Sequence, residues 1–287
     1  MSRHRFHLVN VFASSALSGN ALCVFEDGSA LTDDQMQALA LQFNLSETTF
    51  LLPSTVATAR VRIFTPSFEM PFAGHPTLGS AHVVRMLRPD AGDPVTLEML
   101  AGVIPVAATG DVWTLQARPP RVRAVEATRA EIAAMLGLQE SDLGADAANA
   151  AEAMWVDTGS EQLVVPLRSP EAVARCHVDP ALLAKHASNA RRDGLAYVWA
   201  REHDDALVAR FFFLKNGSLV EDPGTGSACA NLGGWLVATG APLPIALCIR
   251  QGEQTGRACH LGLRVDAEKR IHVTGNVIAI ATGEVAL

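Results

Sequence analysis

The sequence predicts an α+β protein of two similar lobes, each made mainly of strands around a buried helix. Three observations support this prediction. A seven-residue motif occurs near one quarter of the 287-residue chain and again near three quarters, which indicates an internal repeat. Segments with the alternation and β-branched content of strands dominate both halves. An almost uncharged helical segment follows each copy of the motif, which is typical of a buried helix.

The two copies of the motif are expected to begin helices. A polar residue, His75 or Asp222, is predicted at the N-cap, and Pro76 or Pro223 follows at the first helical position, where a missing N–H costs nothing. The small residues that come next would let an anion approach the backbone N–H groups at the positive end of the helix dipole. Pro and Gly also punctuate ordinary loops, but the shared pattern favours two helix starts facing one cleft.

The remaining elements of the first half follow in order. Strands are expected at 6–12, 22–25, 48–52, 59–65, 95–99, 103–107 and 112–116. Thr32 and Gln35 form a capping box before apolar residues at helical spacing, and Asn44 can adopt the left-handed cap, so a surface helix is predicted over 32–44. The first buried helix is expected over 77–87.

The second half repeats this mixture. Late in the first half, a capping box at Thr128 and a closing Gly137 predict one helix, and in the second half Ser169-Pro170 and Asp179-Pro180 begin two more. The second buried helix is expected over 225–239, and strands at 162–166, 195–199, 207–213, 247–250, 261–265 and 271–278. The stretch 138–153 resembles a sheet least, so the lobes are expected to be 1–150 and 151–287, with room for the chain to cross back at its C-terminal end.

Composition excludes several classes of function. A net charge of -7 and a pI near 5.7 provide no basic surface for nucleic acid. Five widely spaced cysteines predict reduced thiols in a cytoplasmic protein. No apolar run reaches the roughly 18 residues of a membrane span, and a signal peptide is not expected. The sequence also carries no convincing nucleotide, pyridoxal or metal motif, so we expect no cofactor and no metal site.

Three side chains are candidates for proton transfer. Glu47 lies in the short connection between the capped helix and an apolar strand, where a carboxylate can point into a cleft. Taken alone it would be a solvated turn residue. If Glu47, His75 and Asp222 converge on a dry anion pocket, they suffice for acid–base chemistry without a cofactor, because burial and neighbouring groups can bring a carboxyl pKa toward neutrality.

These residues lie in motifs that resemble the PhzF-like phenazine-biosynthesis family. The motifs occur in order along essentially the whole chain, at 9–12, 18–21, 44–50, 62–66, 71–77, 221–227, 251–252 and 256–257. The resemblance implies the diaminopimelate-epimerase-like fold, with two pseudo-symmetric lobes, a site between them and usually a homodimer. It also implies the best-known activity of the family, the isomerisation of trans-2,3-dihydro-3-hydroxyanthranilate by a cofactor-free proton shift.

Site residues carry over by motif. Glu47 matches the general acid/base of the family, and His75 and Asp222 match its polar partners. The turns implied to hold a small anionic metabolite are Gly74, Pro76 and Thr77 in the first copy and Gly224, Thr225, Gly226 and Ser227 in the second. Gly224 stands where the family often has Ala.

Two other functions stay open. An amino-acid epimerase or racemase of the related family would use two opposed cysteines, one at each helix start, but Ala73 and Pro223 stand at those turns. A noncatalytic protein that binds small acids would need neither Glu47 nor Asp222 beside the bound carboxylate. The three candidate acid–base residues therefore favour an isomerase.

Overall fold

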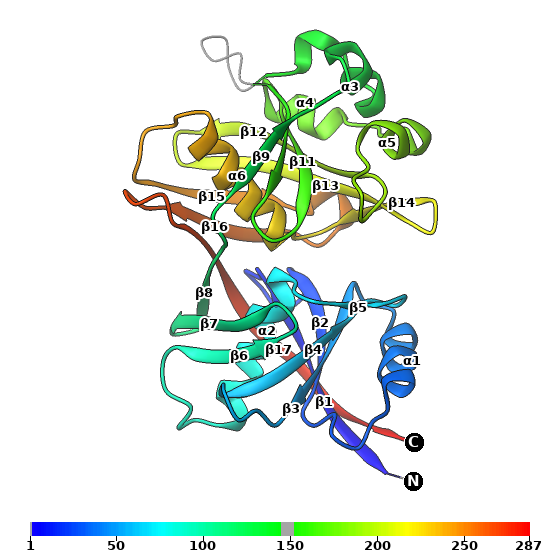
Figure 1. Ribbon diagram of the computed structural model, residues 1–287, viewed down its shortest axis with the longest axis vertical. Coiled ribbons are helices and arrows are strands. Elements are labelled where there is room, and N and C mark those ends of the chain that lie inside the picture. The colour runs from blue at the N-terminus through cyan, green and yellow to red at the C-terminus, as the bar shows by residue number, and fades with distance from the viewer. Residues whose placement is uncertain (1, 145–151) are drawn as a thin grey trace. The chain divides into compact units, whose positions relative to one another are not determined.

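The computed structural model describes residues 2–144 and 152–287, which form two compact units (Figure 1). Unit 1 contains residues 1–116 and 274–287, and unit 2 contains residues 117–273. The boundary expected near residue 150 lies outside the described residues, and the division is found earlier, after Gln116. The reason is that β9 (Arg121–Ala124) pairs with β10 (Met154–Asp157), so the residues after Gln116 already belong to unit 2.

Unit 1 is a ring of strands around one helix. The neighbours round the ring are β1, β2, β3, β4, β6, β7, β8 and β17, and β17 pairs with β1 again. The β2–β3 and β4–β6 pairs are parallel, whereas β1–β2, β1–β17, β3–β4, β6–β7 and β7–β8 are antiparallel. The bounds are Arg3–Val11 (β1), Asn20–Phe25 (β2), Glu47–Leu52 (β3), Ala59–Phe64 (β4), Val95–Met99 (β6), Gly102–Thr109 (β7), Val112–Gln116 (β8) and Ile271–Ala286 (β17).

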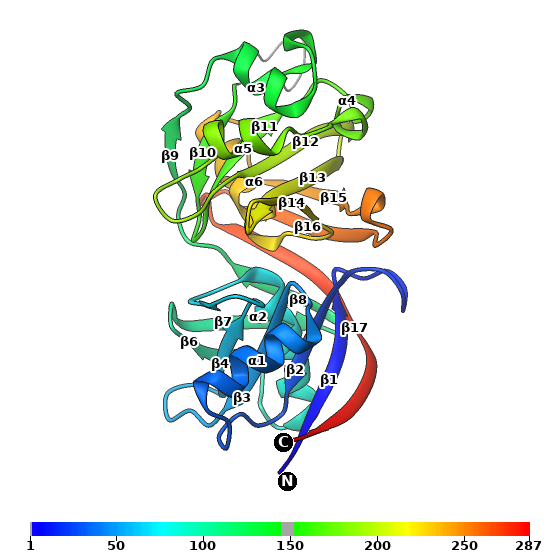
Figure 2. The ribbon, with the colours of Figure 1, turned by 90° about the vertical axis from the view of Figure 1, so that its right-hand side faces the viewer.

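Helix α2 (Gly74–Leu87) lies inside this ring and contacts seven of its strands (Figure 1). Close packing requires small residues on it, since a Cβ at Gly79 would lie 2.6 Å from Leu22. Helix α1 (Asp33–Phe43) covers the outside, over β3 and β4 (Figure 2), and packs on a cluster that includes Phe25 and Phe50. Strands β2 and β3 are therefore buried on both faces.

Unit 2 is a mixed sheet in the order β9-β10-β11-β12-β13-β15-β16. The β11–β12 and β13–β15 pairs are parallel and the others are antiparallel. The short strand β14 also pairs with β13, along the part of β13 that β15 leaves free. The bounds not given above are Glu161–Pro166 (β11), Leu195–His203 (β12), Ala206–Lys215 (β13), Ser218–Asp222 (β14), Ile245–Gln251 (β15) and Cys259–Val265 (β16).

Helices cover both faces of this sheet (Figures 1 and 2). Helix α6 (Gly226–Ala238) packs on one face, where Trp235 contacts Trp199 of β12 with ring centroids 5.1 Å apart. The neighbouring residue Val198 points to the other face, into the core beneath three helices. These helices are α3 (Arg129–Leu136), α4 (Pro170–Arg175) and α5 (Pro180–His186), and two 3-10 turns, η1 (Glu140–Asp142) and η2 (Glu253–Thr255), complete the unit.

The capped helices are where the sequence predicts them. Thr32 and Thr128 both close capping boxes, and Asn44 and Gly137 both take left-handed conformations at the C-caps. Four short strands, β5 (Glu69–Met70), β9, β10 and β14, were not predicted. In the part of the chain that the structure describes, no helix combines the length and apolar character needed to cross a membrane.

Candidate active site

Unit 1 brings together Glu47 and His75, as predicted. Glu47 is the first residue of β3, directly after the turn that ends α1, and His75 lies in the first turn of α2. The Glu47 Oε2 atom is 3.5 Å from His75 Nε2. Only 15% of the Glu47 side chain and 6% of the His75 side chain are exposed. Glu47 is therefore not a solvated turn residue but faces a histidine at the start of the buried helix.

His75 is uncharged at neutral pH. Burial lowers its pKa from 6.5 to about 3, and a hydrogen bond with the backbone of Ala21 opposes this only partly. The second ring nitrogen, Nδ1, lies 3.5 Å from the amide nitrogen of Asn20. A neutral imidazole has one donor and one acceptor nitrogen, so His75 can share a single proton with the Glu47 carboxyl group. The pair has the composition of an acid–base centre.

The start of α2 differs from the prediction. The N-cap is Ala73 rather than His75, and Pro76 is the third helical residue rather than the first. Proline is tolerated there because N–H groups of the first helical turn have no intrahelical partner to lose. Thr77 is fully buried, and its hydroxyl donates to the Ala73 carbonyl at 2.7 Å. We therefore assign Thr77 to the helix structure, and Gly74 and His75 supply the N–H groups of the first turn.

Unit 2 places Asp222 at the end of β14 rather than at a helix N-cap. The N-cap of α6 is Thr225, so Pro223 and Gly224 form a connection before the helix. The prediction that Asp222 caps the helix is wrong because two additional residues separate strand and helix. The Thr225 hydroxyl donates a short hydrogen bond to the Asp222 carboxylate across this connection.

Gln251 at the end of β15 fastens the same connection. Its amide nitrogen donates to the Asp222 carbonyl at 2.9 Å and to the Thr225 hydroxyl at 3.0 Å, and its oxygen accepts from the Thr225 N–H at 3.3 Å. The next residue, Gly252, has φ of +83°, and a Cβ there would lie 2.4 Å from the Pro223 carbonyl. Only glycine fits this approach of two backbones.

Gly226 and Ser227 begin α6. The Ser227 hydroxyl accepts a hydrogen bond of 2.9 Å from the amide of Gln162 on β11. Gln162, Gln251 and Asn231 are not among the site residues predicted from the sequence. Buried carboxamides on otherwise apolar strands and helices are the signal that identifies them, because such groups need partners.

An arginine holds the hairpin before each helix start. Arg62 of β4 donates two hydrogen bonds of 2.7 Å to Glu69 of β5, and Arg210 of β13 donates two, of 3.0 and 2.7 Å, to Glu221 of β14. Arg210 also donates to the carbonyls of Val173, Ala174 and Cys176 at the end of α4. These two pairs, the arginine clamps, tie the strand that leads into each helix start.

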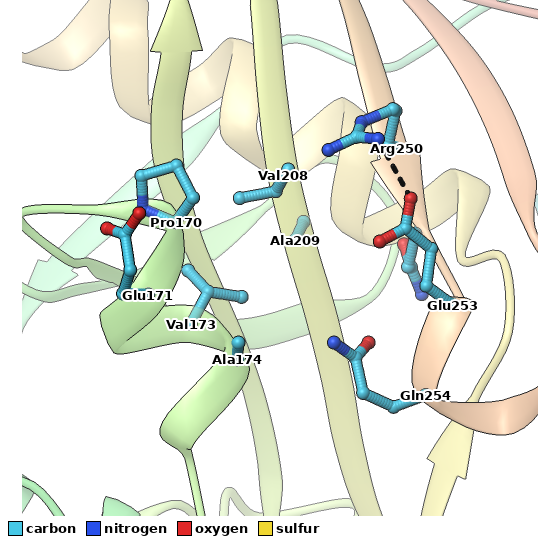
Figure 3. A pocket seen from close by; sticks show the side chains of 10 residues that line it. Pro170, Glu171, Val173, Ala174, Val208, Ala209, Arg250, Glu253 and Gln254 are labelled. Carbon is cyan, nitrogen blue, oxygen red and sulfur yellow. Dashed lines mark ion pairs between the residues drawn. The ribbon is translucent and has the colours of Figure 1, made fainter.

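One cavity of unit 2, of about 230 Å³, lies between α4, β13, β15 and η2 (Figure 3). Its charged side chains include Glu171 and the pair Arg250–Glu253, whose atoms are 3.0 Å apart. Gln251 also lines it, but among the described residues that do so there is no predicted site residue. We therefore do not assign this cavity to the reaction.

The thiols are poorly placed for two-base chemistry. Burial raises the pKa of Cys229, inside α6, and of Cys259 on β16 far above the ordinary value. Within residues 2–144 and 152–287, no three His, Cys, Asp or Glu side chains gather in a way that could hold a metal ion.

Comparison with known proteins agrees with these features. Residues 9–283 match the family described as phenazine biosynthesis-like protein. An uncharacterized isomerase of Pasteurella multocida is 40% identical over 99% of this chain and 94% of its own length. The trans-2,3-dihydro-3-hydroxyanthranilate isomerase of Pseudomonas aeruginosa is 32% identical over 99% of this chain and all of its own. A crystal structure of a PhzF-family protein from Bacillus anthracis has the same fold, with a TM-score of 0.86 and 22% identity over both whole chains.

Proposed function

Because this chain belongs to the family of phenazine biosynthesis-like proteins and is an isomerase, we propose that it shifts a proton on a small carboxylate-bearing substrate without a cofactor. The observation that carries the proposal is the Glu47–His75 pair. A half-buried carboxyl group lies 3.5 Å from a histidine that burial keeps neutral. Such a pair combines a proton acceptor with a neutral imidazole, which is the composition that general acid–base catalysis uses.

In the proposed reaction Glu47 acts twice. Its carboxylate accepts a proton from an acidified C–H bond of the substrate, and the electron pair of that bond passes into the conjugated system. The resulting carboxylic acid then returns the proton to a different carbon, forming the new C–H bond and restoring the enzyme. His75, whose Nε2 atom lies 3.5 Å from Glu47 Oε2, would stabilise each protonation state of the carboxyl group in turn. The reaction involves no net oxidation or reduction, so it needs no redox partner.

The two helix starts are proposed to hold the anionic substrate. Backbone N–H groups at Gly74 and Gly226 and the Ser227 hydroxyl are donors of the type that stabilise negative charge developing in a transition state, each worth about 3 to 4 kcal/mol when well placed. Asp222, held by Thr225 and Gln251, would bind a polar group of the substrate.

The relative from Pseudomonas aeruginosa supplies the first compound to test, trans-2,3-dihydro-3-hydroxyanthranilate. The experiment follows its isomerisation in deuterated water by mass spectrometry and NMR. Wild-type protein is expected to give the isomerised product, with deuterium at the carbon that receives the proton only to the extent that the Glu47 carboxyl group, 15% exposed, exchanges with solvent before it returns the proton. Glu47→Gln should lower the rate by about 10²- to 10⁴-fold, since the substitution removes the base while preserving its shape.

Glu26→Gln is the matched control. Glu26 is 20% exposed and contacts His7 at 2.7 Å, so it is a second Glu–His pair of unit 1 with similar burial. The Glu26→Gln substitution should leave the isomerisation rate within about threefold of wild type. A Glu47→Gln protein that keeps wild-type turnover would overturn the mechanism.

A panel of cyclic carboxylates and amino acids distinguishes the alternatives if this compound is inert. Exchange at the α-carbon of an amino acid, with inversion, would favour an epimerase. Binding without exchange in any compound would favour a noncatalytic protein.

A further inference from the structure

A chain of buried hydrogen bonds runs from the sheet of unit 2 to Ser227. The Asn231 side-chain oxygen accepts from the Thr158 N–H at 2.9 Å and from its hydroxyl at 2.7 Å. The Asn231 amide nitrogen donates to the Ser160 carbonyl and to the Gln162 oxygen, both at 2.8 Å. The Gln162 amide nitrogen then donates to Ser227.

The direction of this chain is fixed at its inner end. A backbone N–H can only donate, so the group that faces the Thr158 N–H must be the oxygen of Asn231, and its nitrogen must face Gln162. The Ser160 carbonyl, which can only accept, imposes the same orientation. Gln162 is thereby forced to present its nitrogen to Ser227. Ser227 accepts this bond, so its own proton is left to be donated elsewhere.

These side chains are nearly inaccessible to water, with exposures of 5% for Thr158, 2% for Gln162 and 0% for Asn231. Reversing one amide would place two donors or two acceptors opposite each other, in a site where no water can enter to satisfy them. The donors and acceptors of this chain of hydrogen bonds can therefore be arranged in only one direction. The chain ends at the side chain of Ser227, at the start of α6.

We propose that Gln162 and Asn231 are positioning residues that hold the Ser227 hydroxyl as a hydrogen-bond donor toward the substrate carboxylate or developing oxyanion. This inference rests on the proposed function, because it requires Ser227 to contact the substrate. It explains why uncharged amides occupy an otherwise apolar region behind a helix start. It also assigns unit 2 a role in selecting substrates with an acceptor at that point rather than a donor.

The test is a double-mutant cycle with Gln162→Met and Ser227→Ala. Binding of anthranilate, a stable aromatic carboxylate, is measured by calorimetry, and turnover of trans-2,3-dihydro-3-hydroxyanthranilate is measured as KM and kcat. Each single substitution should weaken anthranilate binding and raise KM by about 10- to 150-fold, the range of one hydrogen bond to a charged group, with little change in kcat. In the Ser227→Ala background, Gln162→Met should have no further effect.

Thr158→Val is the matched control. It removes one buried hydrogen bond from the opposite end of the chain, but the Thr158 N–H still fixes the Asn231 orientation. Binding should stay within about twofold of wild type, even though some stability is lost.

Two results would overturn this inference without affecting the proposed function. The first is that the effects of Gln162→Met and Ser227→Ala on anthranilate binding multiply in the double mutant. The second is that Thr158→Val weakens anthranilate binding as much as Gln162→Met does, which would mean that the chain of hydrogen bonds only supports the helix. If Gln162→Met does not fold, Gln162→Glu, which presents an acceptor to Ser227, provides the same cycle. Wild-type protein that binds neither anthranilate nor any compound of the panel, and exchanges no proton on any of them, would instead refute the proposed function.

Discussion

The two helix starts share a sequence motif and a scaffold but differ in chemistry. In each unit one strand, β4 or β13, pairs with a single neighbour along one side and with two partners, one after the other, along its other side. An arginine clamp then ties the hairpin that leads into the buried helix. In both clamps the arginine also lies over a phenylalanine two residues later, 5.0 Å from the Phe64 ring and 4.7 Å from the Phe212 ring.

The polar residues around these starts do different work. The start of α2 faces a titratable pair, Glu47 and His75. The start of α6 is held by the neutral carboxamides of Gln162 and Gln251, with a single carboxylate, Asp222, beside its N-cap. Titratable groups in dry surroundings can move protons, and amides of fixed orientation can hold a substrate. A repeat can therefore preserve backbone geometry while the polar side chains around each copy diverge.

The largest expected effect separates the clamps. Arg210→Ala should lower the free energy of unfolding by about 3 to 5 kcal/mol, because it leaves Glu221, only 15% exposed, without its partner and removes a donor to the end of α4. Arg62→Ala should cost about 1 to 2 kcal/mol, since Glu69 is 23% exposed and can be hydrated. Denaturant titration of both variants checks this. Equal losses would mean that the clamps are equivalent.

His75 should make the stability of unit 1 depend on pH. The unfolded state binds a proton at His75 near pH 6.5, whereas the folded state does so only near pH 3, so the unfolding free energy falls as pH falls through this window. Between pH 6.5 and 5 wild type should lose about 2 kcal/mol more than His75→Gln. Asn231→Ala, in the neutral chain of unit 2, should keep the wild-type slope. Parallel slopes for wild type and His75→Gln would contradict a buried neutral histidine.

The smallest expected effect is that of alkylating the thiols. A nucleophilic cysteine in unit 2 would contradict the difference between the two helix starts. Iodoacetamide at pH 7 should leave turnover unchanged, because burial raises the pKa of Cys229 and Cys259, and only Cys248 is exposed. Mass spectrometry should find label on Cys248 alone, and Cys248→Ser should take up none. Inactivation that tracks labelling of Cys229 would revive the epimerase mechanism.

Local signals predicted the elements that local interactions determine. The capping boxes at Thr32 and Thr128 and the proline starts of α4 and α5 need only a few neighbouring residues, and all four helices begin where expected. Strand β14 was missed although Asn216 and Gly217, both with positive φ, form the kind of hairpin turn that joins it to β13. That turn was the available signal for placing Asp222 on a strand.

Tertiary contacts decided the rest of the candidate site. The motifs predicted Glu47, His75 and Asp222 as site residues, and the structure brings the first two together within unit 1. The partners of Ser227 and Thr225 come from residues 65 positions upstream and 26 positions downstream, so spacing along the chain could not reveal them. The division after Gln116 has the same kind of cause, because the pairing of β9 with β10 is not local.

Strand β17 has a consequence for the order of folding. It enters unit 1 from unit 2 and pairs with β1, so the ring around α2 uses both the first and the last strands of the sequence. During translation every residue of unit 2 is therefore synthesised before the strand that completes unit 1. Unit 1 begins first in the sequence but is completed last. Until β17 has been synthesised, the apolar strands of its ring lack the strand that closes the ring.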